Sequence, residues 1–411
     1  METTSRHTNW TGVALGLTLA SYAAFQQFKL PPALPLMLDA YGYDRTLAGG
    51  FMSVYAAAGL FLSLALGRHM ERRGPVSAVL LALSLMALGT LATLAVPESG
   101  WLVLAARTLE GVAFAVLAIA GPVLANSNAG RDHLPLVIAL TAAWIPIGQL
   151  SAILLAQPGF ALLGWQSLWW VALALTVALA IWVGALARRG HPAVRTGSQR
   201  ASVSGEAEAA PATVSRAQRL SLALAGAIFM LWSGQYFAYM TWLPQYLVEA
   251  LGFSLGGALF GYTLPVSVLL VAILITGHAM NRGVALGGLL VGGLAAQTVS
   301  WIMLPLAGDG LFGVLALIVY GAAAGVVPTC LFAMPSAIAG HGRTAATAFG
   351  IIMTGRNLGV LIGPVMLAQA FAMTGGWNWS APMLGGVTAV ALVLGVWLSR
   401  RIGGTNYGTS R

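Results

Sequence analysis

Four ionisable side chains fall deep inside long apolar stretches of this sequence, where a charge is expensive and is therefore a candidate for function. They are Lys29, Arg107, Glu110 and Arg356. A carboxylate beside an arginine can carry a proton, whereas a lysine or a guanidinium fork can hold an anion, and the fork suits a carboxylate best. Three of the four are cations, so the balance favours an anionic ligand.

Lys29 is the only lysine in the chain, and Tyr22, Gln26 and Lys29 follow each other at helical i, i+4, i+7 spacing on one face. We predict that these three side chains bind the substrate. The alternative is a lysine that extends its chain to the outer membrane interface, which Pro31 and Pro32 could bring closer.

Arg356, followed by Asn357, lies too far from either end of its apolar stretch to reach water easily. A guanidinium in such a place needs a counter-charge, a cluster of carbonyls or an anionic ligand. Glu110 is one helical turn from Arg107 and is thus already committed. We therefore predict that Arg356 and Asn357 bind an anion, with a structural Arg356–Glu110 pair as the alternative.

Glu110 is the natural proton carrier, with Arg107 as its modulator, because burial and a nearby cation act on a carboxyl group in opposite directions. A permanently ionised structural pair is an equally good interpretation. A further polar group follows in the second half of the chain, where Gln235, Tyr236 and Tyr239 combine aromatic bodies with polar tips that suit a small organic solute. Some aromatic residues there could instead belong to the interfacial belt.

The elements that position these residues must be membrane helices. Hydrophobic residues make up 58% of the 411, charged residues only 8%, and the mean hydropathy is +0.83. Soluble chains contain about 45–50% apolar and about 25% charged residues. The composition therefore predicts an all-α integral membrane protein.

Twelve apolar stretches are long enough to span a bilayer. They cover residues 11–38, 45–67, 75–96, 101–127, 135–157, 167–187, 219–248, 256–277, 284–306, 311–339, 346–372 and 381–399. The segment 188–218 is polar and predicts a cytoplasmic linker between an N-terminal bundle, 1–187, and a C-terminal bundle, 219–400, followed by a tail, 401–411. Gln26-Gln27-Phe28 recurs as Gln235-Tyr236-Phe237, which indicates a duplicated six-helix unit.

The charges outside the spans set the orientation. Of the twenty basic residues, sixteen fall on the side of the linker and both termini, so the positive-inside rule predicts cytoplasmic termini in a cell inner membrane. The net charge of +9 is thereby explained without a nucleic-acid partner. We expect a monomer whose partners are a small anionic substrate, protons and the lipid bilayer.

Cofactor chemistry has little support. Cys330 is the only cysteine, which excludes a multi-cysteine metal site, and the single lysine excludes a Walker loop. There is no catalytic constellation either. We therefore expect no metal, no cofactor and no enzymatic activity.

The segment from Gly67 to Gly74, with Glu71 and Arg72, resembles the G-x-x-x-D-R-x-G signature of the major facilitator superfamily, and Arg107-Thr-Leu-Glu110-Gly111 resembles its R-x-x-Q-G element. A degenerate copy of the first motif follows at 277–283. The resemblance implies two six-helix bundles related by a pseudo-twofold axis that alternate access to a central site. It also implies that Gly67, Glu71, Arg72 and Gly74 form a cytoplasmic gate, with a plain topological turn as the alternative.

The drug-antiporter element of this family is absent from the fifth span, and a partial version, Gly355, Gly359 and Gly363, occupies the eleventh. This spacing places small residues on one helix face and predicts close helix packing. The cationic centre resembles bacterial permeases for cyanate, nitrate and small carboxylates. We predict a secondary active transporter of a small organic or inorganic anion such as a carboxylate, acting by proton symport. The alternative is proton-driven efflux of hydrophobic drugs or metabolites.

Overall fold

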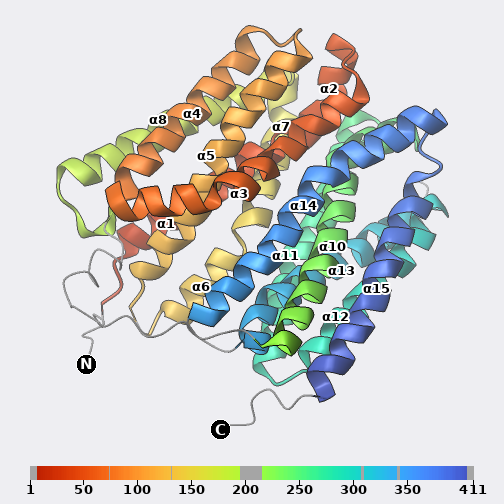
Figure 1. The fold of residues 1–411 in the computed structure, drawn as a ribbon. Helices are drawn as coiled ribbons and strands as arrows, with labels where there is room; N and C mark the ends of the chain where they lie inside the picture. Colours follow the sequence, from red (N-terminus) through yellow and green to blue (C-terminus); the bar gives the residue numbers. More distant parts are fainter. Residues whose placement is uncertain are drawn as a thin grey trace. The chain divides into compact units, whose positions relative to one another are not determined.

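The computed structural model describes residues 7–73, 75–130, 132–194, 215–306, 310–339 and 343–404. Every regular element in these ranges is a helix (Figure 1). Ten of the helices are long and apolar enough to cross a membrane. The predicted all-α membrane fold is therefore confirmed.

The chain divides into two compact units, Met1–Glu208 and Ala209–Arg411. Unit 1 contains α1 (Trp10–Phe28), α2 (Leu30–Tyr41), α3 (Arg45–Arg73), α4 (Pro75–Ala95), α5 (Gly100–Ser127), α6 (Leu134–Ala142), α7 (Trp144–Leu163), α8 (Gln166–Arg188) and the short η1 (Pro192–Val194). Unit 2 contains α10 (Arg216–Glu249), α11 (Leu255–Asn281), α12 (Leu286–Met303), η2 (Leu304–Leu306), α13 (Leu311–Ala339), α14 (Arg343–Thr374) and α15 (Ser380–Gly404). The residues of the predicted linker from 195 to 214 lie outside the described ranges.

Two predicted spans are each broken into two helices, which corrects the expectation of continuous helices over 11–38 and 135–157. The first breaks at Lys29, between α1 and α2, and the second at Ala143, between α6 and α7. Proline explains both breaks, because it lacks the N–H that would bond four residues back. Pro31 cannot donate to Gln27, and Pro146 cannot donate to Ala142.

Glycines bring α1 close to α5 in unit 1. A Cβ added at Gly121 would lie 2.8 Å from the carbonyl oxygen of Gly16, so only glycine permits this approach of the two backbones. The contact joins the first half of α1 to the last third of α5. Further along the same pair of packed helices, Lys29 and Glu110, far apart in the sequence, lie within reach of each other.

The same device joins α14 to α10 in unit 2. A Cβ at Gly355, Gly359 or Gly363 would overlap a backbone carbonyl oxygen of α10. The packing role predicted for these three glycines is confirmed. Ser233 on α10 also donates a hydrogen bond to the carbonyl oxygen of Arg356 at 2.8 Å, so this interface fixes the backbone from which Arg356 projects.

Gly359→Ala should lower the stability of the protein, because its methyl group would overlap the carbonyl oxygen of Met230 and separate the two helices. Overpacking of this kind costs about 1–3 kcal/mol. Melting of the purified protein in detergent measures the effect. Gly350→Ala on the same helix is the matched control, since its Cβ would meet no atom within 4 Å. Equal melting temperatures of the two variants would contradict the proposed close packing.

Candidate functional site

A fully buried cluster of charges lies at the centre of unit 1. The side chains of Lys29, Arg107 and Glu110 are each 0% exposed. The Lys29 Nζ lies 2.9 Å from one carboxylate oxygen of Glu110, and an Arg107 nitrogen lies 2.7 Å from the other. One carboxylate therefore bridges two cations.

Hydroxyl groups from two further helices complete the coordination of Glu110. Tyr55 of α3 donates to Oε2 at 2.7 Å, and Thr90 of α4 donates to Oε1 at 3.0 Å. Both oxygens thus accept one charged and one neutral hydrogen bond, which is the satisfaction that a buried carboxylate requires. The carboxylate ties together the α1–α2 break, α3, α4 and α5.

Arg107 also supports the break between α1 and α2. Its two terminal nitrogens donate to the carbonyl oxygens of Gln26 and Gln27, each at 3.0 Å, and its Nε donates to the carbonyl of Phe51 at 3.1 Å. The bond to Gln27 replaces the one that Pro31 cannot make. The guanidinium further lies over the Tyr55 ring, with 4.2 Å from Cζ to the centroid. Arg107 is thus held by the backbone as well as by Glu110.

The structure corrects the expectation that Glu110 is committed to Arg107 alone, because the ammonium group of Lys29 also pairs with this carboxylate. It also donates to Gln26 Oε1 at 2.6 Å and lies 4.6 Å from the centroid of the Trp169 ring. With no exposed surface, Lys29 does not extend to an interface. The predicted neighbours Tyr22 and Gln26 do join it: the Gln26 amide donates to the Tyr22 hydroxyl, which bonds to Thr176.

The formal charges of this cluster do not cancel. Two cations against one carboxylate leave a balance of +1, carried by groups that have no contact with solvent. A buried net charge is costly unless an opposite charge can approach it. The cluster therefore keeps a positive balance in a buried place.

Unit 2 holds a second buried cation. Arg356 is 7% exposed, and one of its terminal nitrogens donates to the Asn357 Oδ1 at 3.0 Å. Its guanidinium carbon lies 5.5 Å from the centroid of the Phe237 ring. The predicted Arg356 and Asn357 are therefore hydrogen-bonded to each other, and no described carboxylate of unit 2 forms an ion pair with the guanidinium.

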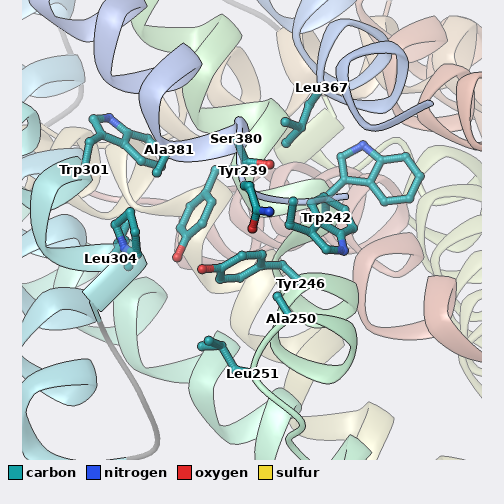
Figure 2. A pocket seen from close by; sticks show the side chains of 13 residues that line it. Tyr239, Trp242, Tyr246, Ala250, Leu251, Trp301, Leu304, Leu367, Ser380 and Ala381 are labelled. Carbon is teal, nitrogen blue, oxygen red and sulfur yellow. The ribbon is translucent and has the colours of Figure 1, made fainter. Parts of the chain in front are cut away.

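The three predicted residues of α10, Gln235, Tyr236 and Tyr239, each contact a different set of side chains. The Tyr236 ring stacks on Trp232 at 5.0 Å between centroids, while Gln235 accepts a hydrogen bond from Tyr320 at 3.4 Å. Tyr239 packs against the Tyr320 and Trp301 rings at 4.7 and 5.1 Å. Tyr239 also lines a pocket with Trp242 and Tyr246 at the end of α10 distant from the linker (Figure 2).

A comparison with models of protein families finds a match to the Major Facilitator Superfamily over residues 14–364. The chain belongs to the Major Facilitator Superfamily. A comparison with curated proteins finds no match. The family consists of transporters, so the chain is a multi-pass membrane protein and a secondary transporter. The match spans both units and does not specify the substrate.

For this transporter, the element from Arg107 to Gly111 has a clear structural role. Arg107 and Glu110 meet across one helical turn, while a Cβ at Gly111 would lie 3.0 Å from the Tyr55 Cα. This glycine therefore allows α3 to approach until Tyr55 reaches the carboxylate. Gly67, Glu71 and Arg72 belong to α3, but their side chains, and Gly74 entirely, lie outside the described residues. The gate remains a prediction.

Sequence reasoning missed four side chains of the unit 1 cluster: Tyr55, Thr90, Trp169 and Thr176. Each is nearly or fully buried, and the four come from three helices, α3, α4 and α8. A polar group within an apolar span is a signal that could have indicated Tyr55 and Thr90. Nothing in the local sequence indicates that they share one carboxylate. Among the described residues, no group of His, Cys, Asp and Glu could hold a metal ion.

Proposed function

We propose that this secondary transporter moves a small organic or inorganic anion, such as a carboxylate, together with protons. The observation that supports this most strongly is the buried cluster with two cations and one carboxylate. Its positive balance in a dry environment favours an anion over a neutral or cationic solute. Arg356, a buried guanidinium whose fork matches a carboxylate, supports the same substrate class.

Lys29 is the member of the cluster that can change partners. Arg107 donates to three backbone carbonyls, whereas within the described part of the chain the ammonium group of Lys29 donates to the side chains of Gln26, Thr90 and Glu110. A substrate carboxylate can therefore draw Lys29 away from Glu110 without breaking the backbone support. In this proposal Tyr22 and Gln26, which continue from Lys29, provide polar contacts to the substrate.

Proton coupling follows from the same exchange. When Lys29 turns to the substrate, Glu110 loses one of its two cations, and a proton can take that place on the carboxylate. Release of the substrate returns Lys29 to Glu110 and expels the proton. Anion and proton then travel in the same direction, as in a symporter of an inner membrane with cytoplasmic termini.

A binding screen tests the substrate class. Purified protein is heated with carboxylates, with inorganic anions and with lipophilic amines, and the shift in melting temperature is measured. Stabilisation by an anion is expected, since a ligand that binds only the folded state raises its stability. Stabilisation by the amines alone would contradict the proposal and favour efflux of hydrophobic compounds.

Lys29→Gln should weaken binding of the anion found in this screen by roughly 10-fold or more, because a charge-assisted contact is worth about 1.5–3 kcal/mol. The amide retains hydrogen-bonding capacity but brings the balance of the cluster to zero. Arg189→Gln, at an exposed position after α8, is the control that removes an equal charge elsewhere. Unchanged affinity in Lys29→Gln would exclude this lysine as a substrate ligand.

A further inference from the structure

A separate cavity in unit 2, lined in part by Tyr239, takes no part in the exchange proposed between Lys29, Glu110 and the substrate. It encloses about 200 Å³ where the ends of α10, α12 and α14 meet the start of α15 (Figure 2). Pockets for drug-sized ligands measure roughly 300–1,000 Å³, so this one accommodates a smaller group. In the predicted orientation it lies toward the outer face of the membrane.

Aromatic side chains dominate the wall of this cavity. Tyr239, Trp242, Tyr246, Trp301 and Trp377 all contribute, and the lining includes no lysine, arginine, histidine or carboxylate. In Figure 2, Trp301 and Trp242 stand on opposite sides, with Tyr239 and Tyr246 between them. Aromatic faces carry negative potential and attract organic cations, most strongly where water is excluded. A wall without basic groups offers nothing to repel such a cation.

Glu249 strengthens the negative potential of the wall from behind. Its Oε2 accepts a hydrogen bond from the Trp377 indole at 2.8 Å, and its Oε1 accepts one from Gln245 at 2.6 Å. A carboxylate bonded to the indole N–H pushes electron density into the ring. The Trp377 ring, which lines the cavity, is therefore richer in electrons and lies next to a carboxylate.

A polar group inside the cavity has no partner. The Tyr239 hydroxyl is buried, and no hydrogen bond to it is formed by the residues that the structure describes. Figure 2 shows this hydroxyl directed toward the same space as the hydroxyl of Tyr246. Leaving a buried hydroxyl unpaired is unfavourable, so a ligand with an oxygen at this point would gain from it.

We propose that this cavity binds a quaternary ammonium group that carries an oxygen close to the nitrogen, as in a choline headgroup. The trimethylammonium end contacts the aromatic wall beside Trp377 and Glu249. The oxygen bonds to the Tyr239 hydroxyl. The group is either free in solution or part of a phosphatidylcholine-type lipid, and the two sources share this chemistry.

Binding to the purified full-length protein in a sugar-headgroup detergent tests the charge requirement. Tryptophan fluorescence is titrated with choline and with its neutral isostere, in which carbon replaces nitrogen. Choline should bind roughly 2- to 30-fold more tightly, the range that cation–π attraction supplies. A short-chain phosphatidylcholine forms a second arm. Binding of the lipid alone assigns the site to lipid, binding of choline assigns it to a soluble cation, and binding of neither overturns the proposal.

Variants test the placement of the ligand. Tyr239→Phe should weaken choline about 3- to 10-fold and leave tetramethylammonium, which has no oxygen, unchanged. Trp377→Phe should weaken both cations, while Trp397→Phe, at a half-exposed position on α15, should weaken neither. Equal loss of both cations in Tyr239→Phe would overturn the assignment of the oxygen. If Trp377→Phe does not fold, the two ligands on Tyr239→Phe still decide the question.

Discussion

Glu110→Gln should abolish accumulation of substrate against its gradient while exchange of substrate across the membrane continues. The amide has the shape of the carboxylate, and its single acceptor oxygen can keep the hydrogen bond from either Tyr55 or Thr90, but it cannot alternate between charged and neutral forms. A pH gradient then has no group through which to act. Uptake into vesicles with and without an imposed pH gradient separates the two activities.

The same substitution leaves Lys29 and Arg107 buried without their shared counter-charge. Breaking a buried ion pair in this way costs about 3–5 kcal/mol, so the melting temperature should fall and a bound anion should restore it. The Lys29→Gln, Glu110→Gln double variant returns the cluster to a balance of +1. It should recover stability but not coupling.

Glu98→Gln, in an exposed position before α5, is the control for removal of a carboxylate. It should leave both uptake and melting unchanged. Accumulation against the gradient by Glu110→Gln would show that this carboxylate is only structural and that coupling resides elsewhere.

Arg356→Ala should lower the affinity for the anion roughly 10- to 100-fold. The substitution removes a charge-assisted contact at a site that is nearly dry, a loss of about 1.5–3 kcal/mol. Arg356→Lys should recover only part of the affinity, because a point charge cannot reproduce the two parallel bonds of the fork. Isothermal titration of the three proteins measures the difference.

Stability distinguishes this role from a structural one. No carboxylate of the described part of unit 2 pairs with Arg356, so its removal should change the melting temperature little in the absence of ligand. Arg282→Ala, at the exposed C-terminal cap of α11, is the matched control. A variant at position 356 that unfolds more easily yet binds the anion normally would exclude the proposed anion contact.

Several features of the fold follow from the sequence because they depend on local patterns. Hydropathy alone predicts membrane helices for apolar stretches of this length. In lipid every backbone N–H and C=O needs a hydrogen-bond partner within the protein, and a helix provides all of them within one segment. The spacing of Gly355, Gly359 and Gly363 predicts a close helix contact, and the i, i+3 spacing predicts the pair of Arg107 and Glu110. Pro31 and Pro146 are also a sequence signal for the helix breaks that precede them. Span length and hydropathy, used alone, predict continuous helices at both places.

Other features depend on contacts between residues distant in the chain. Lys29 and Glu110 are 81 positions apart, and the packing of α1 against α5 brings them together. A sequence shows that a charge is buried but not which opposite charge reaches it, and for this reason the sequence assigns Glu110 to Arg107 alone. The hydrogen-bond partners of Arg107 could not be predicted from the sequence either. They are backbone carbonyls, which every residue has, so no residue type indicates which of them the guanidinium reaches.

The sequence by itself therefore determined that this chain spans a membrane with helices, that few charges lie inside them, and that most of those are positive. The tertiary structure decided how those charges are shared: Glu110 is held by two cations, and Arg356 by an amide and a ring. The physical reason is distance. Apolar periodicity acts within one helix, whereas an ion pair requires atoms within about 4 Å, which only the packing of separate helices provides.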